Sequence, residues 1–339
     1  MRSLRLHLNE QTAGCSAAVL AAIRALERES FAQYPDTAAV SAKTAAWLGV
    51  PTECVVLTNG LDEGLHVVAQ WARRVALDPQ TSGSVVVVEP AFDMYAACAE
   101  AVGLGITRVL PNADFAFPIE RVLKAITPRT RLIYLNDPNN PTGLGIPAGQ
   151  IEQIAAAAPQ AVVLVDEAYA EFSGRSCVLD LPHRRRNVVV GRTFAKAHGL
   201  AGLRIGALIA APETIAQLRP ILPPFSINIC AATALDAALD DRAYLEWYLG
   251  EVTASKRLIY QFAERRAVRH WPSEGNYVLM RLADSAPEVV AAMAARGVLI
   301  RDRSQLPGCE GCIRITAGVV AATERCLAEL EAVLASRTN

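Results

Sequence analysis

The nine residues Ala161–Tyr169 read AVVLVDEAY, and they decide the fold class of this chain. Their first five residues are apolar without polar alternation, which indicates a strand buried on both faces of a sheet. Two carboxylates, Asp166 and Glu167, follow at the point where this strand would end. Because ligands of open α/β sheets bind beyond the carboxyl ends of the strands, Asp166 is a candidate site residue.

Similar apolar runs recur along the first part of the chain and alternate with Ala- and Leu-rich helical patterns such as Leu61–Val75 and Ile151–Ala158. The predicted strands are Val55–Leu57, Ser84–Val88, Arg131–Leu135, Ala161–Val165, Asn187–Val190 and Ile205–Ala210. This alternation predicts an α/β fold in which helices cover both faces of a mostly parallel sheet.

The pattern changes at the proline-rich stretch Pro220–Ile229. A helix-rich stretch and two short strands follow, and they predict a smaller α+β domain. These elements are Ala231–Arg266, Tyr277–Arg281 and Cys312–Thr316. The expected division is 34–230 for the large, site-bearing domain, and 1–33 with 231–339 for the small domain.

Composition excludes several classes of protein. A length of 339 residues with 52% hydrophobic residues allows a large core, and the net charge of −1 gives no electrostatic support for binding nucleic acid or a membrane surface. The sequence shows no apolar stretch long enough for a membrane-spanning helix and no secretory signal at its N-terminus. The scattered cysteines indicate reduced thiols, and Cys309 and Cys312 lack a second pair for zinc. We therefore expect a cytoplasmic protein with no metal site.

Polar residues follow the ends of other predicted strands as well. Arg131–Leu135 leads into NDPNNPTGLG, which contains Asn140, and Asn187–Val190 leads to Thr193 and Lys196. Lys196 lies among glycines, alanines and leucines, and an apolar environment keeps a lysine amine neutral and nucleophilic.

A possible anion site follows Val55–Leu57. Gly60 permits a tight turn, and the free N–H groups of Leu61 and Asp62 at a helix start would bind an anion such as phosphate. Taken alone, Asp62 indicates only a favourable interaction with the helix dipole. Taken alone, Asp166 indicates only an ion pair with a nearby cation. Together, a sheltered lysine, a buried aspartate and a phosphate site are what pyridoxal 5′-phosphate needs.

Several motifs carry a resemblance to a known family. NDPNNPTG, VDEAY and TFAKAHGLAGLRIG resemble the fold type I pyridoxal-phosphate-dependent aminotransferases. LHLNE, QYPD, NGLDEG and CIRIT are similar to the histidinol-phosphate aminotransferase branch, and the resemblance extends from Leu6 to about Leu334. It implies the PLP-dependent transferase fold, with the cofactor in the large domain.

The resemblance also implies a role for each matching residue. Lys196 would attach to the cofactor's aldehyde and carry the α-proton, and Asp166 would pair with the pyridine nitrogen. Asn140 and Tyr169 would donate to the phenolic oxygen of the ring, on which Phe92 would stack. The phosphate ligands would be Thr193, Arg204 and the backbone of Leu61 and Asp62.

The same resemblance implies a homodimer with shared active sites. Tyr34, in QYPD, would reach the phosphate of the neighbouring subunit's cofactor and the substrate. Arg314, in CIRIT, would bind the anionic end of the substrate, together with Arg301 and Asn140. For Arg314, an internal salt bridge is the structural alternative.

Three features depart from the family pattern. Ala195 stands where serine is common, which would remove one hydrogen bond worth ~1–2 kcal/mol. His198 replaces a common phenylalanine; it could contact the substrate, but we expect it to be packed in the core. Only five residues precede Leu6, whereas the resemblance implies a longer N-terminal arm over the pocket.

The leading functional hypothesis is transfer of an amino group from histidinol phosphate to 2-oxoglutarate, in histidine biosynthesis. The alternatives are an aromatic amino-acid aminotransferase, a PLP-dependent decarboxylase of an amino-acid phosphate, and a non-catalytic protein of the same fold. The amino donor stays open at this stage, because an arginine binds the phosphate and carboxylate groups of all these substrates.

Overall fold

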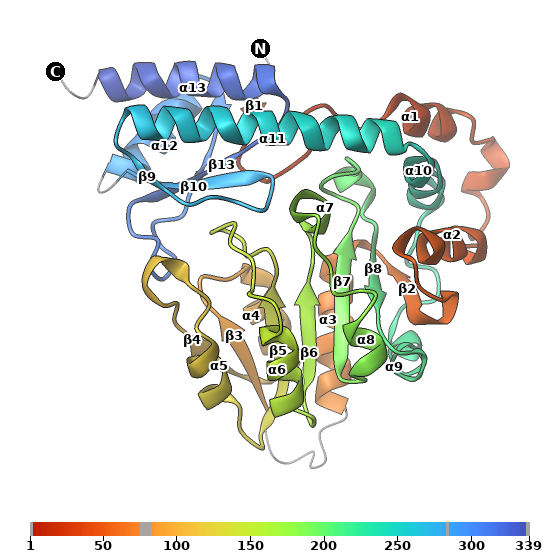
Figure 1. Ribbon diagram of the computed structural model, residues 1–339. Coiled ribbons are helices and arrows are strands. Elements are labelled where there is room, and N and C mark those ends of the chain that lie inside the picture. The colour runs from red at the N-terminus through yellow and green to blue at the C-terminus, as the bar shows by residue number, and fades with distance from the viewer. Residues whose placement is uncertain (1–2, 75–82, 283–284, 337–339) are drawn as a thin grey trace.

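The computed structural model describes residues 3–74, 83–282 and 285–336 (Figure 1). At its centre lies a seven-stranded sheet with the strand order β2-β8-β7-β6-β5-β3-β4. Its strands are β2 (Val55–Thr58), β3 (Ser84–Val88), β4 (Gly105–Val109), β5 (Thr130–Asn136), β6 (Val162–Asp166), β7 (Val188–Thr193) and β8 (Gly206–Ile209). Only β8 runs antiparallel to its neighbours β2 and β7. The predicted, mostly parallel sheet is confirmed.

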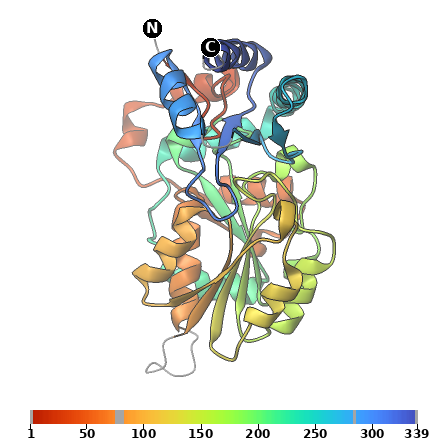
Figure 2. The ribbon, with the colours of Figure 1, turned by 90° about the vertical axis from the view of Figure 1, so that its left-hand side faces the viewer.

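Helices cover both faces of this sheet, as Figure 2 shows. One layer contains α1 (Ala17–Arg24), α2 (Ala38–Leu48), α5 (Ile119–Ala125), α6 (Gln150–Ala157), α8 (Leu181–Arg184) and α10 (Ile229–Asp240). The other contains α3 (Gly60–Arg74), α4 (Asp93–Ala101) and α9 (Pro212–Leu218). The short helix α7 (Ala170–Ser173) follows β6.

The central strand β6 shows why its sequence lacks alternation. Val163 and Val165 belong to the buried cluster under the first layer, whereas Val162 and Leu164 belong to the cluster under the second. Both faces of the strand are therefore in a core, and each position must be apolar.

A second, four-stranded antiparallel sheet has the order β12-β13-β10-β9. Its strands are β9 (Arg269–His270), β10 (Tyr277–Arg281), β12 (Arg301–Asp302) and β13 (Cys312–Thr316). The helices α11 (Arg242–Arg265), α12 (Ala286–Ala295) and α13 (Val320–Ala335) share its buried cluster, and α11 and α13 lie across the top of Figure 1. Near the N-terminus, β1 (Leu4–Arg5) pairs in parallel with β11 (Val298–Leu299).

The predicted elements and the observed ones differ at a few places. The strand β4 was not predicted, because most of its residues are at least partly exposed. The predicted helix Leu61–Val75 is observed as α3, and Val75 lies outside the described residues. The domain division at 34 and 230 stays a prediction; Val19 of α1 and Leu235 of α10 share a buried cluster with the residues of the seven-stranded sheet.

The two cysteines of the CxxC motif are both buried, in a small cluster with Phe115, Trp271 and Leu279. In the described part of the chain, no group of three or more His, Cys, Asp or Glu side chains could hold a metal ion. None of the described helices is long and apolar enough to cross a membrane.

The start of α3 packs very closely on β8, and glycine makes this approach possible. A Cβ atom at Gly206 would lie 2.8 Å from both the carbonyl oxygen of Arg192 and the backbone nitrogen of Leu61. Real Cβ atoms essentially never show so short a contact, and both neighbours are backbone atoms, which shift less easily than the end of a flexible side chain. Gly206 therefore sets the position of the helix start.

We expect Gly206→Ala to lower the free energy of unfolding by about 1–3 kcal/mol, because the added methyl group overpacks two backbone atoms. Urea unfolding measures this change. The matched control is Gly250→Ala in α11, where a Cβ meets open space. This control should stabilise the protein by about 0.5–1 kcal/mol, since alanine is the better helix former. Equal stabilities for the two variants would contradict the packing argument.

Candidate active site

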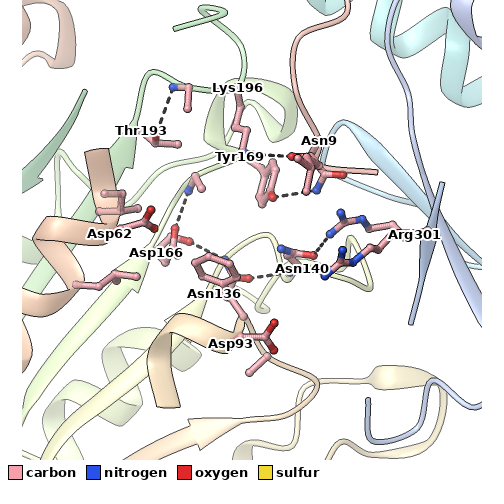
Figure 3. Close-up of a pocket in the computed structure, with 18 of the residues that line it drawn as sticks. Asn9, Asp62, Asp93, Asn136, Asn140, Asp166, Tyr169, Thr193, Lys196 and Arg301 are labelled. Atoms are coloured by element: carbon pink, nitrogen blue, oxygen red, sulfur yellow. Dashed lines mark hydrogen bonds between the residues drawn. The ribbon is translucent and has the colours of Figure 1, made fainter. Parts of the chain in front are cut away.

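A cavity of about 220 Å³ opens at the carboxyl ends of the parallel strands (Figure 3). It takes side chains from both sheets and from the N-terminal segment. The predicted site residues among its lining are Leu61, Asp62, Phe92, Asn140, Asp166, Tyr169, Thr193, Lys196, Arg204, Arg301 and Arg314. The structure thus brings together eleven of the twelve predicted side chains, and Tyr34 is the exception.

Asp166 ends β6 and is 4% exposed. Its carboxylate accepts hydrogen bonds from the hydroxyl of Tyr95 at 2.7 Å and from the backbone nitrogen of Ala168 at 3.0 Å. Burial raises the pKa of Asp166 to about 6, although both hydrogen bonds act in the opposite direction. A cation in the cavity would stabilise the ionised carboxylate.

Tyr95 is a site residue that the sequence reasoning missed. Its ring is buried on α4, stacks on Tyr134 with 4.6 Å between centroids, and meets Phe92 edge-on at 5.9 Å. The aromatic residue one turn after Phe92 in EPAFDMY was the available signal. Tyr95 holds the carboxylate of Asp166 in one orientation through its hydroxyl group.

Lys196 lies in the loop between β7 and β8. Its Nζ donates to the carbonyl oxygen of Leu8 at 3.0 Å. Burial lowers the pKa of Lys196 to about 8, and the positive charge of Arg314 contributes in the same direction. The amine is therefore partly neutral near pH 8, which a nucleophilic lysine requires.

The start of α3 forms one end of the cavity. Gly60 has φ = 70°, which favours glycine, and a Cβ atom there would lie 2.6 Å from Nη2 of Arg204. Arg204 in turn donates to Asp62 at 2.8 Å. The first N–H groups of a helix have no intrahelical partners, so this end offers backbone donors and a guanidinium group to an anion.

Thr193 and Ala195 lie beside this helix start. The hydroxyl of Thr193 accepts a hydrogen bond from the backbone nitrogen of Ala195 at 3.2 Å. Ala195 also lines the cavity but offers no hydroxyl group, so the departure from the family pattern falls within the site.

Arg314 lies on β13 and is 2% exposed. It donates from Nη1 to Oδ1 of Asn140 and from Nη2 to the carbonyl oxygen of His7, the latter at 2.7 Å. Its guanidinium group also lies over the ring of Tyr277, at 5.4 Å from the centroid. Burial lowers the pKa of Arg314 to about 10. No ion pair of Arg314 is observed among the described residues, so the structure gives the salt-bridge alternative no support.

Two further arginines lie near Arg314. Arg301 pairs with it in register across β12 and β13, and Arg303 lines the same cavity. Arg303 was not predicted, because a loop arginine after RD carries no distinctive pattern. The buried Nε atoms of Arg303 and Arg314 have no hydrogen-bond partner in the described part of the chain. Figure 3 places Arg301 on the side of the cavity opposite Asp62 and Asp166.

Tyr34 and His198 lie outside this cavity lining. Tyr34 is 75% exposed and stacks on Phe225 with 4.0 Å between ring centroids. His198 is 4% exposed and meets Trp47 and Phe194 edge-on. The prediction that His198 is packed in the core is confirmed.

The cavity fits pyridoxal phosphate on three observations. Lys196 offers an amine with a lowered pKa to an aldehyde, and Asp166 offers a buried carboxylate to a ring cation. The start of α3 with Arg204 offers donors to a phosphate. These are the functional groups of one small cofactor, and they surround one cavity.

Comparison with known proteins agrees with this fit. Residues 4–330 match the family model "Aminotransferase class I and II". The chain is 36% identical to histidinol-phosphate aminotransferase 2 of Ralstonia nicotianae, over 98% of this chain and 89% of the relative. It is 34% identical to histidinol-phosphate aminotransferase 2 of Carboxydothermus hydrogenoformans, over 97% and 91%.

A solved structure supports the cofactor as well. Histidinol-phosphate aminotransferase of Sinorhizobium meliloti, in complex with pyridoxal 5′-phosphate, superimposes with a TM-score of 0.87. It is 26% identical to this chain, and the match covers 99% of this chain and 91% of the other. With a family match over nearly its whole length, this chain belongs to the class I and II aminotransferases, as a pyridoxal-phosphate-dependent enzyme related to the histidinol-phosphate aminotransferases.

Proposed function

We propose that this aminotransferase transfers the amino group of histidinol phosphate to 2-oxoglutarate, in histidine biosynthesis. One observation carries the proposal: the same cavity is lined by Lys196, whose amine has a lowered pKa, and by three arginines that form no ion pair within the described residues. Such an arrangement suits a substrate with an amino group and a doubly charged phosphate. The names of the relatives support the same substrate.

The chemistry divides between the cofactor and the side chains of this chain. Pyridoxal phosphate, when bound, supplies an aldehyde and an electron-withdrawing ring. We assign to Lys196 the attachment of the aldehyde and the transfer of the α-proton, because its amine is neutral at moderately alkaline pH. Asp166, oriented by Tyr95, would stabilise the positive charge on the ring nitrogen.

The remaining cofactor contacts follow from the lining of the cavity. We assign the phosphate to the backbone of Leu61 and Asp62 and to the side chains of Thr193 and Arg204. Phe92 would cover one face of the ring. The phenolic oxygen of the ring would accept hydrogen bonds from two further side chains, Asn140 and Tyr169.

At the opposite end, Arg314 would bind the phosphate of histidinol phosphate in one half-reaction and a carboxylate of glutamate in the other. Its planar guanidinium group can donate two parallel hydrogen bonds to either anion. Because Arg314 is buried and forms no ion pair in the described part of the chain, an incoming anion meets a poorly solvated charge. Arg301 and Arg303 add positive charge, and Asn140 anchors one side of the guanidinium group.

We further propose a cytoplasmic homodimer in which Tyr34 completes the active site of the partner subunit. Tyr34 and Phe225 form an exposed stacked pair, with 75% and 58% of their surfaces accessible. Large aromatic side chains are enriched in the cores of protein interfaces. A second copy of the chain would bury this pair.

The first experiment tests Lys196. Borohydride reduction of the cofactor-loaded protein should place the pyridoxyl label on Lys196, as read by peptide mass spectrometry. The rate of cofactor capture by the apoprotein should rise with pH around a midpoint of about 8, since only the neutral amine attacks an aldehyde. Lys196→Ala should bind the cofactor noncovalently and lose transamination by several orders of magnitude. A label on another lysine would overturn the proposed function.

The second experiment tests Arg314. Arg314→Lys keeps the charge but loses the two parallel hydrogen bonds. We expect a lower kcat/KM for both histidinol phosphate and glutamate, equivalent to a loss of about 2–4 kcal/mol of transition-state binding. The absorbance spectrum of the cofactor should be unchanged. The matched control is Arg325→Lys on the exposed side of α13. A wild-type preference for phenylalanine over histidinol phosphate by about tenfold would favour an aromatic aminotransferase instead.

The third experiment tests the shared site. In the proposed dimer, each site takes Lys196 from one subunit and Tyr34 from the other. A dimer of one Lys196→Ala protomer and one Tyr34→Phe protomer would therefore contain one undamaged site and one site with both substitutions. The mixture should therefore be more active than either parent at equal protein concentration. A wild-type protein that sediments as a fully active monomer would rule out this arrangement.

A further inference from the structure

Three consecutive residues near the N-terminus each contact one side chain of the candidate active site. The pairs are His7 O with Arg314 Nη2 (2.7 Å), Leu8 O with Lys196 Nζ (3.0 Å), and Asn9 Nδ2 with Tyr169 Oη (3.0 Å). Two of these contacts are made by the backbone, so side-chain replacement would leave them in place. The third depends on the amide group of Asn9, which is visible beside Tyr169 in Figure 3.

The backbone of Asn9 has a conformation that few residues tolerate. Its φ is 55°, in the left-handed region, and the residue is 1% exposed. Asparagine and aspartate enter this region more readily than other residues with a side chain. The backbone nitrogen of Asn9 donates to Oγ1 of Thr316 at 3.1 Å, which ties this turn to β13.

The amide of Asn9 has a defined orientation. Oγ1 of Thr316 donates to Oδ1 of Asn9 at 3.2 Å, so the amide NH₂ group is directed to Tyr169. A phenolic oxygen that accepts this hydrogen bond keeps its own proton for another acceptor. Tyr169 is 4% exposed and lines the cavity, which leaves that proton for a group inside it.

Building on the proposed function, we infer that Asn9 is a positioning residue: it fixes Tyr169 as a donor to the phenolic oxygen of the cofactor ring. Without this constraint the hydroxyl group of Tyr169 could rotate and donate elsewhere. Burial raises the pKa of Tyr169, so the hydroxyl group stays protonated over the working range of pH and has a proton to donate. The N-terminal turn thereby controls a hydrogen bond in which it takes no direct part.

Asn9→Asp tests this inference with little change in shape. Aspartate also tolerates the left-handed backbone, but its carboxylate accepts the proton of Tyr169 and turns it away from the cavity. A donor stabilises negative charge on the ring oxygen, so its loss makes the oxygen retain a proton to higher pH. The pH midpoint of the visible absorbance of the cofactor-loaded protein should rise by about one unit. The dissociation constant of the cofactor should increase about tenfold.

Two further variants separate the effect of the lost hydrogen bond from the effect of the added charge and from a loss of folding. Asn9→Gly relieves the backbone and removes the donor without adding charge, and it should raise the midpoint by less than Asn9→Asp does. In a Tyr169→Phe background, Asn9→Asp should cause a clearly smaller shift, because only the added charge acts and no hydroxyl proton remains to be turned. Thermal unfolding of each apoprotein shows that the variants are folded, and Asn9→Gly carries the test if Asn9→Asp is not.

The outcomes distinguish this inference from the proposed function. An unchanged midpoint in Asn9→Asp, or an equal shift in the Tyr169→Phe background, overturns the positioning role while the borohydride label still falls on Lys196. A label on any other residue defeats the proposed function itself. An upward shift that requires the hydroxyl group of Tyr169 supports the inference.

Discussion

The carboxylate of Asp166, buried at the end of β6, is the constraint on which the site depends. A buried carboxylate without a cationic partner is costly, and the raised pKa of Asp166 expresses this cost. The protein compensates only in part, with hydrogen bonds from Tyr95 and from the backbone of Ala168. The ring of Tyr95, which carries that hydroxyl group, is buried and stacks on Tyr134. A cationic group on a ligand would therefore stabilise this carboxylate further.

Arg314 presents the opposite case on the second sheet. It is buried, its pKa is lowered, and its neutral partners are an amide oxygen and a backbone carbonyl. An unpaired buried charge of either sign destabilises a fold, so a protein that keeps one of each in a single cavity has a use for both. A ligand with a cationic ring near Asp166 and an anionic group near Arg314 would compensate both charges. A cofactor joined to a phosphorylated or carboxylated substrate carries both groups.

The sequence predicted the sheet and most of the site because both follow from local patterns. Runs such as Val162–Val165 report burial on both faces, and Asp166 and Lys196 stand out against apolar neighbours. The missed residues have no such contrast. Tyr95 looks like any aromatic helix residue, and Arg303 lies in an ordinary polar loop. Asn9 acts only because Thr316, more than 300 residues later in the chain, orients its amide. The motif LHLNE contains Asn9, but the contact with Thr316 cannot be read from a local pattern.

The departures from the family pattern bear unequally on the choice of substrate. Ala195 lies beside Thr193 and the start of α3, at the end of the cavity proposed for the cofactor phosphate. Without a hydroxyl group, Ala195 would bind that phosphate less tightly than serine would. The opposite end of the cavity would be unaffected. His198 packs between Trp47 and Phe194 and lines no part of the cavity. Neither change is at Arg301, Arg303 or Arg314, so the proposed discrimination between amino donors rests on the charge and geometry at those three arginines. Because the positive charges of Arg301 and Arg303 both act on Arg314, the three guanidinium groups would favour a dianionic phosphate over the single carboxylate of an aromatic amino acid.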